Sequence, residues 1–342
     1  MSRLWITFWL LGATGCFSTH YLVQASIGQA KLLGSARPLT VAIHDPKTPP
    51  RIRRLLGWVP ELKGFGVSRG LEPTENYNRY ANLERNAAVW LVQGCAPLRF
   101  DTRHWSFPIV GTVPYLGFFD EQAARDYGAE VARNEALDVD VRPAAAYSTL
   151  GWFRDPVLST MISEGDDALG ELANVVLHES VHATFYVTGQ SAFNESLASF
   201  VGDHLTGEWL LLRLGLRSPE AHAWLDSQHR YDLRVARFHR AYEELDALYK
   251  SELSDAEKLT RKRALLSALK RELSTRREIN NATLAGFRTY DTGGPAFEKL
   301  LAASGNDWPR FWAAVRTLRQ SDFPTAQMEA FSPVVEKLAA PK

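Results

Sequence analysis

Apolar residues recur every three or four positions along several stretches of the chain, a spacing that predicts amphipathic helices. The first stretch runs from residue 19 to 35 and ends just before Pro38, which cannot continue a helix. A second helix is expected from residue 50 to about 56, with a continuation after Pro60. Asp120 is a typical N-cap residue, so we expect another helix to begin directly after it.

Extended segments are indicated where β-branched and aromatic residues crowd together or alternate with polar ones. Residues 87–92 and 105–119 are of this kind, the latter interrupted by proline and glycine, and residues 138–141 alternate. Because these segments are few and short, we predict a small β-sheet.

Helical periodicity dominates the second half of the chain. Two helices separated by a brief turn are expected between Gly165 and Gly207. From about Ser218 to Glu278 the chain is charged and periodic, with a break at Ser254, which predicts a long helical hairpin at about residues 218–285 with a solvated outer face. Two short helices should follow, at residues 295–303 and 308–318.

Neither an internal repeat nor a convincing linker divides these elements, so we predict a helix-dominated α+β fold in which residues 17–342 form one domain. The chain of 342 residues can bury a substantial core, and its 45% hydrophobic and 23% charged residues are typical of globular proteins. Its 39 Lys and Arg balance 39 Asp and Glu, which gives no reason to expect nucleic acid as a partner.

The first sixteen residues have the features of an export signal. Arg3 supplies a positive charge, residues 4–11 are apolar, and small residues lead directly into Cys16. The apolar stretch is shorter than a transmembrane helix requires. Small residues before a cysteine resemble the cleavage site of bacterial lipoproteins, so we predict that residues 1–16 form a lipoprotein signal peptide and that Cys16 carries the lipid. An ordinary cleaved signal and an uncleaved anchor are the alternatives.

The residue after this cysteine bears on the final location. Phe17, where Asp would retain a lipoprotein in the inner membrane, favours the outer membrane by the rules of that class. We therefore expect an exported protein that is held in the bacterial cell envelope by its N-terminal lipid and faces the periplasm.

Cysteine usage restricts the kinds of metal site that the chain can build. The only two cysteines, Cys16 and Cys95, exclude a disulfide framework and a cysteine-rich zinc module. Any metal must therefore be held by histidines and carboxylates, which is typical of catalytic rather than structural zinc. We expect Cys95 to be a buried, inert thiol.

The strongest chemical signal is the segment His178-Glu179-Ser180-Val181-His182. Two histidines four residues apart lie one helical turn apart on one face, so both imidazoles can reach the same ion. Glu179 is then placed to accept a proton from the attacking water as a general base. An apolar stretch precedes His178, which predicts a buried helix that holds the ligands rigidly.

A third ligand is expected on the following helix. Glu195 comes shortly after the turn that ends the first helix, where it would return to face His178 and His182. Two histidines and one glutamate leave a fourth position open, as in hydrolytic zinc sites. In the simpler alternative, the histidines are a packed or surface pair and Glu195 is a charge that favours a helix N-terminus.

Segments spread over most of the chain match one known family. They are residues 21–25, 28–29 and 37–38; residues 107–111 and 114–119; residues 146–153 and 155–156; residues 192–196; and residues 290–291 and 295–297. Together with the segment 178–182 they resemble a family of bacterial lipoproteins described as putative aminopeptidases, of the HExxH class with a glutamate ligand. The resemblance implies a zincin-like metallopeptidase fold and says little about the substrate.

Such a hydrolase also needs a donor for the oxyanion that develops on the attacked carbonyl. Tyr147, in a turn rich in Ser and Gly just before the metal helices, is our first candidate, with Tyr115 and Tyr290 as reserves. Each of them can instead be an aromatic core residue with its hydroxyl bonded elsewhere.

Two acidic residues are candidates for orienting a ligand histidine by accepting a hydrogen bond from the ring nitrogen that does not bind the metal. These are Asp155 and Asp203. His204 lies nine residues after Glu195, a spacing that points it away from the ligands, so we expect a surface or packing role.

These observations predict a zinc-dependent peptidase, an aminopeptidase by resemblance, that acts on peptides with Glu179 as the general base. Residues 106–110 could align an extended peptide along a sheet edge. Two alternatives stay open, a lipid-anchored non-catalytic metal-binding scaffold and a metal hydrolase of a non-peptide amide. Glu179 argues against the first, because a structural site has no use for a base. The peptide end attacked and the oligomeric state do not follow from the sequence.

Overall fold

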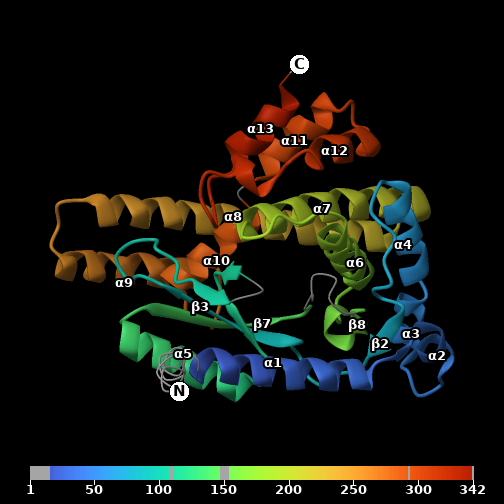
Figure 1. Cartoon of the computed structure of the whole chain (residues 1–342), viewed down its shortest axis with the longest axis horizontal. Coiled ribbons are helices and arrows are strands. Elements are labelled where there is room, and N and C mark those ends of the chain that lie inside the picture. Colours follow the sequence, from blue (N-terminus) through green and yellow to red (C-terminus); the bar gives the residue numbers. More distant parts are fainter. Residues whose placement is uncertain (1–15, 108–110, 147–153, 292, 341–342) are drawn as a thin grey trace, which may run out of the picture.

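The computed structural model describes residues 16–107, 111–146, 154–291 and 293–340, and helices make up most of it (Figure 1). The helices are α1 (Cys16–Ser35), α2 (Leu39–His44), α3 (Pro50–Leu56), α4 (Val59–Ser68), α5 (Glu121–Glu135), α6 (Ala168–Thr184), α7 (Ser191–Leu214), α8 (Pro219–Lys250), α9 (Asp255–Glu272), α10 (Asn281–Asp291), α11 (Gly294–Ala303), α12 (Trp308–Val315) and α13 (Ser332–Ala339). The strands are β1 (Arg37–Pro38), β2 (Arg79–Ala81), β3 (Val89–Cys95), β4 (Trp105–Phe107), β5 (Gly111–Val113), β6 (Leu116–Phe118), β7 (Asp138–Ala144) and β8 (Val157–Leu158). The predicted α+β class, dominated by helices, is confirmed.

The strands form three small sheets within the described ranges. The first has the order β6-β3-β7, and its central strand β3 pairs antiparallel with both neighbours, with Leu91 opposite Gly117 and Arg142. The second has the order β1-β2-β8, and β4 and β5 form a two-stranded ribbon. The described part of residues 105–119 forms the three short strands β4, β5 and β6. Residues 108–110, part of the edge expected to align a peptide, lie outside the described residues.

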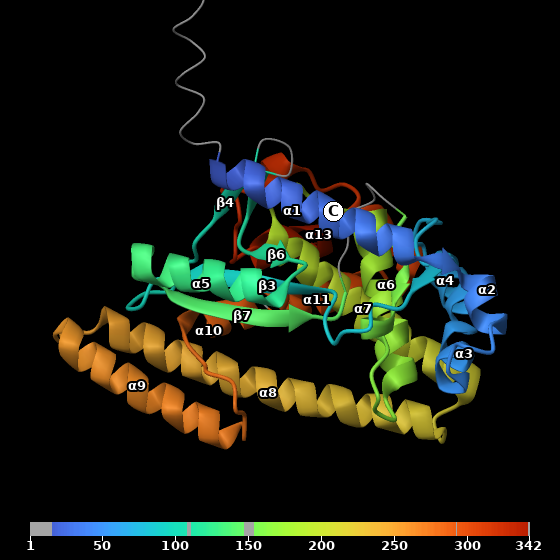
Figure 2. The same cartoon turned by 90° about the horizontal axis from the view of Figure 1, so that it is seen from below.

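Helix α5 covers one face of the β3 sheet. Asp120 caps it as predicted, because its carboxylate accepts a hydrogen bond from the Ala123 amide at 2.8 Å. A Cβ added at Gly128 would lie 2.9 Å from Val141, so the helix backbone rests directly on β7. Figures 1 and 2 show α1 and the α8–α9 hairpin on opposite sides of this sheet.

Helix α6 lies between two hydrophobic cores, which makes it a rigid support. One core packs Leu172 and Val176 against α1–α4 and β2, and contains Trp209 and Trp224. The other packs Leu177 and its neighbours against α7 and the C-terminal helices α11–α13, which form a separate layer beside α7 in Figure 1. The prediction of a buried helix before the ligands is confirmed.

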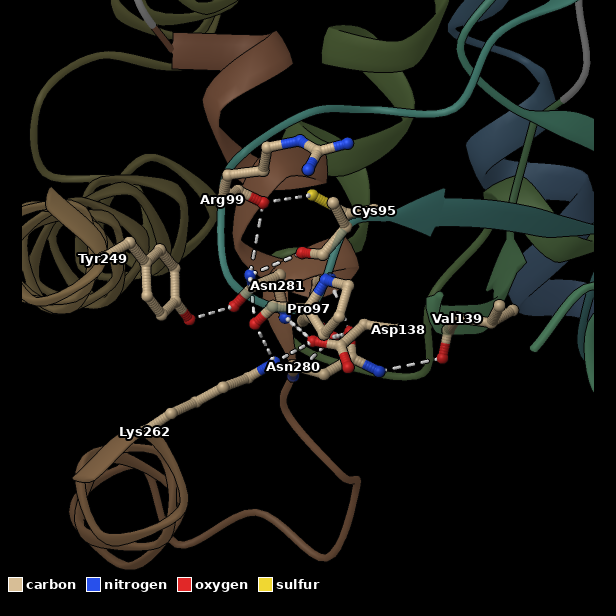
Figure 3. A network of polar contacts seen from close by, with 11 residues as sticks. Cys95, Pro97, Arg99, Asp138, Val139, Tyr249, Lys262, Asn280 and Asn281 are labelled. Atoms are coloured by element: carbon tan, nitrogen blue, oxygen red, sulfur yellow. Dashed lines mark hydrogen bonds and ion pairs between the residues drawn. The ribbon is translucent and has the colours of Figure 1, made fainter. Parts of the chain in front are cut away.

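The predicted helical hairpin is present as α8 and α9, and a polar cluster fastens it to the sheet (Figure 3). The Lys262 ammonium, on α9, forms an ion pair with Asp138 on β7 and donates to the Pro97 carbonyl at 2.8 Å. Asn281 donates through its side chain to the Ala96 carbonyl at 2.8 Å and through its backbone amide to Asp138 at 3.0 Å. We call Asp138, Lys262, Asn281 and Tyr249 the hairpin clamp.

The hairpin ends earlier than predicted, at Glu272 rather than near residue 285. Residues 281–291 form α10, which turns back onto β3 and β7 instead of extending α9. The physical reason is Asn281: its buried side-chain nitrogen donates to the Ala96 carbonyl directly after β3, so the chain must return there.

Most other helices begin and end close to the predicted residues, whereas α2, α13 and the β1-β2-β8 sheet were not predicted. Among the described residues no helix is both long and apolar enough to cross a membrane. Export and the lipid on Cys16, the first residue of α1, stay predictions.

Candidate metal centre

Two consecutive helices, α6 and α7, supply the candidate ligands. His178 and His182 follow each other by one turn near the end of α6, and Glu195 lies in the first turns of α7. The two helices can approach closely because Gly202 has no side chain. A Cβ there would lie 3.3 Å from the Cβ of His178.

The structure brings the three predicted ligands together. One ligand atom from each of His178, His182 and Glu195 lies within 4.8 Å of the others, a group that could hold a metal ion. Glu195 Oε2 lies 3.3 Å from His178 Nε2 and 3.7 Å from His182 Nε2. The two rings stand nearly perpendicular, at 82°. Both Nε2 atoms therefore converge on the same carboxylate oxygen.

Hydrogen bonds within the loop between α6 and α7 fix the position of the first turns of α7, which carry Glu195. Asn194, which is almost fully buried, accepts a hydrogen bond from the Val187 amide at 2.9 Å and donates to the Val187 carbonyl at 2.8 Å. Gln190 donates to the Thr325 carbonyl at 2.8 Å and accepts from the Met328 amide at 3.0 Å. The residue next to the ligand is thus tied to the backbone of the loop, and the loop is tied to the C-terminal segment.

Electrostatics keep the carboxylate ionised. Burial alone would raise the pKa of Glu195, but the two imidazoles outweigh it and hold this pKa well below its ordinary value. Burial alone would lower the pKa of His182, but the charge of Glu195 outweighs it and raises this pKa. The site therefore favours a negative oxygen facing positive charge, which is also what a bound cation needs.

Two buried polar atoms at the site lack a partner within the described part of the chain. They are Nδ1 of His182 and Oε2 of Glu179. Buried polar atoms are ordinarily hydrogen-bonded, so an orphaned carboxylate oxygen beside two histidines indicates a missing partner such as water or substrate. The donor set of two imidazoles and one carboxylate suits a borderline-soft divalent ion. The residues present therefore fit a zinc ion.

A cavity of 630 Å³ opens onto these residues. Its walls come from α1, α6, α7, α8 and the strand segments near β3 and β5. They include His178, Glu179, His182 and Glu195 together with Phe107, Val113, Tyr115, Tyr186, Trp224 and Tyr231. A space of this size with mostly apolar walls and a few converging polar groups is typical of a small-molecule or peptide site.

The tyrosine candidates fall in different places. Tyr147 lies outside the described residues, and its role stays a prediction. Tyr115 lines the cavity, and the backbone of Tyr290 belongs to α10. Tyr186 also lines the cavity, with its ring 6.2 Å from that of His182, and was not a candidate in the sequence.

The two acidic candidates also separate. Asp203 lines the cavity, accepts a hydrogen bond from Asn174 at 2.7 Å, and interacts with His178. Burial raises its pKa to about 6, against the lowering influence of His178. Asp155 is buried, and its backbone amide and carbonyl bond Asn76 and Tyr77. The predicted role of each in orienting a histidine stays a prediction.

Two further expectations are confirmed. His204 points away from the ligands and lies 2.8 Å from Glu298 at the surface. Cys95 is fully buried, and burial raises the pKa of its thiol to about 12, so it stays protonated.

Besides Tyr186, sequence reasoning missed two further residues of this region. Glu171 and Asn194 line the cavity, and neither was among the candidates named from the sequence. The signal for Glu171 was its spacing: it lies seven residues, or two turns, before His178 and so on the same helix face.

Comparison with known proteins gives one result at the level of family. A family model described as "Putative aminopeptidase" matches residues 20–329. No curated protein and no solved structure gives a significant match. The match spans nearly the whole chain, including every candidate ligand and both helices that carry them. The chain therefore belongs to the family described as putative aminopeptidases.

Proposed function

We propose that the protein is a zinc-dependent peptidase of zincin-like fold, with His178, His182 and Glu195 as metal ligands and Glu179 as the general base. The observation that carries this proposal is the meeting of the three ligand atoms, within 4.8 Å of one another, in the wall of a 630 Å³ cavity. Family membership supports peptidase activity. A purely structural site would be closed by a fourth protein ligand, and no further His, Cys, Asp or Glu joins this group among the described residues.

The chemistry follows from the residues. A zinc ion held there supplies a Lewis acid that polarises the peptide carbonyl and makes a nearby water more acidic. Glu179 lines the same cavity and has a buried oxygen with no partner among the described residues, which leaves it able to accept the proton of the attacking water. The same carboxyl group then delivers that proton to the leaving amine. The aromatic and aliphatic walls exclude bulk water, which strengthens these interactions.

The test compares two proteins that differ only in whether residue 179 carries a carboxylate or an amide. The form lacking residues 1–16 and its Glu179→Gln variant are purified, and bound zinc and hydrolysis of a peptide library are measured for both. We expect nearly one zinc per chain in each and a loss of hydrolysis of about 10²- to 10⁴-fold in the variant, because the amide cannot accept a proton.

Other outcomes have defined meanings. Zinc in both proteins without hydrolysis of any peptide would contradict the peptidase proposal and favour a binding role or a non-peptide amide as substrate. The absence of zinc in both proteins would overturn the assignment of the ligands.

A further inference from the structure

The cavity extends well beyond the candidate ligands, along one face of α6 to helix α8. Glu171, Asn174 and His178 line it at helical spacing on α6. Trp224, Ser227 and Tyr231 line it at the same spacing on α8. Seven residues of helix separate Glu171 from His178, which corresponds to about 10 Å along the axis. The far end of the cavity is therefore bounded by these two helix faces.

Among the residues that the structure describes, no cation pairs with the Glu171 carboxylate. It is half-buried, and within the described residues its one hydrogen-bonding partner is the Ser227 hydroxyl, which donates to it at 3.3 Å. Asp167, the N-cap residue directly before α6 and one turn from Glu171, instead pairs with Arg230 at 3.8 Å. Burial, followed by the charge of Asp167, raises the pKa of Glu171. A nearby cation stabilises the charged form of a half-buried carboxylate. Of Glu171 and Asp167, only Asp167 has such a cation among the described residues.

The composition of the walls points the same way. The described residues that line the cavity include four carboxylates and neither lysine nor arginine. The acidic residues are Glu171, Glu179, Asp203 and Glu195. A cavity with this charge attracts cations and repels acidic groups.

An aromatic wall stands next to Glu171. A Cβ added at Gly170 would lie 2.7 Å from the ring of Trp224, so the glycine lets the indole pack directly on the backbone that precedes Glu171. Trp224 is almost fully buried and lines the cavity. Carboxylate and aromatic surface together are the environment that binds a lysine or arginine side chain, because each stabilises the charge and the rings also cover the aliphatic stem.

We propose that Glu171, assisted by Ser227 and by the wall formed by Trp224 and Tyr231, binds the cationic side chain of a lysine or arginine residue of the substrate. This assignment rests on the proposed function, because the attacked carbonyl is placed at His178, His182 and Glu195. The terminal amine of the residue attacked would lie next to its own carbonyl. A long side chain of that residue, or of its neighbour, extends instead toward a carboxylate two helical turns away.

The experiment uses the full chain, purified in detergent and loaded with zinc. Hydrolysis is measured on matched peptides that carry lysine, arginine or norleucine at each position around the cleaved bond. We expect kcat/KM for the best-placed lysine or arginine to exceed that for norleucine by about 10- to 100-fold. Glu171→Gln should reduce this ratio to within about threefold. Asp167→Asn, which removes the same charge one turn away outside the cavity, should keep the ratio of the unmodified protein.

Binding provides a readout that does not need turnover. Titration calorimetry on the zinc-loaded Glu179→Gln protein measures the affinity of the same peptides with and without an additional Glu171→Gln substitution. The lysine preference should persist when the peptide amino terminus is acetylated, because the side chain carries the recognised charge. A preference that disappears on acetylation would overturn the side-chain assignment in favour of the terminal amine.

The two proposals fail in distinguishable ways. Hydrolysis without a preference for cationic side chains, or with a preference that Glu171→Gln leaves intact, overturns the Glu171 subsite and leaves the peptidase proposal standing. Glu171-dependent binding of lysine peptides without any hydrolysis supports the subsite while the peptidase proposal fails. If Glu171→Gln does not fold, the unmodified protein still overturns the subsite when it shows no preference for lysine or arginine over norleucine.

Discussion

The molecule contains two buried polar clusters that are built in opposite ways, the hairpin clamp (Asp138, Lys262, Asn281 and Tyr249) and the candidate metal centre. In the clamp every buried side-chain nitrogen and oxygen of the described residues has a partner. Tyr249, for example, donates to the Asn281 side chain at 2.7 Å (Figure 3). In the metal centre, Nδ1 of His182 and Oε2 of Glu179 are buried and have no hydrogen-bonding partner among the described residues.

The difference separates a cluster that serves stability from one that serves chemistry. The clamp pairs a buried cation with a carboxylate and then satisfies the remaining groups with backbone carbonyls, as a low-dielectric interior demands. The metal centre sets one carboxylate against two imidazoles and leaves a neighbouring carboxylate oxygen unused. An orphaned group costs free energy in a folded protein, so it is expected where a ligand or substrate completes the site.

The largest effect is expected when a candidate ligand is removed from the metal centre. His182→Ala should abolish zinc binding and reduce peptide hydrolysis by at least about 10³-fold, because both the proton transfer and the polarisation of the carbonyl depend on the occupied site. Zinc should raise the melting temperature of the unmodified protein and leave that of the variant unchanged. Metal content, hydrolysis and thermal unfolding are measured on the same samples.

His204→Ala is the matched control for this variant. His204 lies on α7, as Glu195 does, but it pairs with Glu298 at the surface, so its removal should keep one zinc per chain. Equal metal content in His182→Ala and the unmodified protein would contradict the ligand assignment.

The clamp should respond to substitution through stability alone. Asp138→Ala leaves the Lys262 ammonium buried without its carboxylate, which should lower the free energy of unfolding by about 3–5 kcal/mol. Urea denaturation measures this change, and zinc content per folded chain should remain that of the unmodified protein. Replacing both partners, as Asp138→Leu with Lys262→Met, should cost less than the single substitution because no charge is left unpaired. A double variant as unstable as Asp138→Ala would show that packing, and not the charge pair, sets the energy of the clamp.

The sequence predicts the metal centre better than it predicts the clamp, and the reason is the sequence distance over which each is encoded. His178, Glu179 and His182 lie within five consecutive residues, so periodicity alone places the two histidines on a common face with Glu179 beside them. Glu195 follows after a short turn, which limits where it can go. The clamp joins Asp138 to a lysine 124 residues later, and no local pattern records that pairing.

The same distinction explains the errors in the fold. The hairpin was predicted to continue to about residue 285 because the charged, periodic stretch reaches Glu278, whereas the buried Asn281 donates to the carbonyl of Ala96, directly after the distant strand β3. The β1-β2-β8 sheet was missed because its strands have only two or three residues each and pair across long stretches of chain, such as Tyr80 with Val157. Tertiary pairing decides such elements, and local propensity does not.

The smallest effect is expected at Asn194, which differs from both clusters. Its side-chain amide is hydrogen-bonded to the Val187 backbone, as in the clamp, but it lies next to Glu195 of the metal centre. Asn194→Ala removes both hydrogen bonds to the Val187 backbone and leaves a buried amide and carbonyl unpaired, so unfolding should become easier by about 1–3 kcal/mol. Asn194 directly precedes Glu195 and holds the start of α7 in place. Zinc affinity should therefore also fall, by about 10- to 100-fold, as for other groups that orient a ligand. Competition with a chromophoric chelator measures the affinity, and urea denaturation of the metal-free protein measures the stability. Loss of stability with unchanged zinc affinity would mean that packing between α6 and α7 positions Glu195 without Asn194, and that the loop contributes to the fold but not to the metal centre.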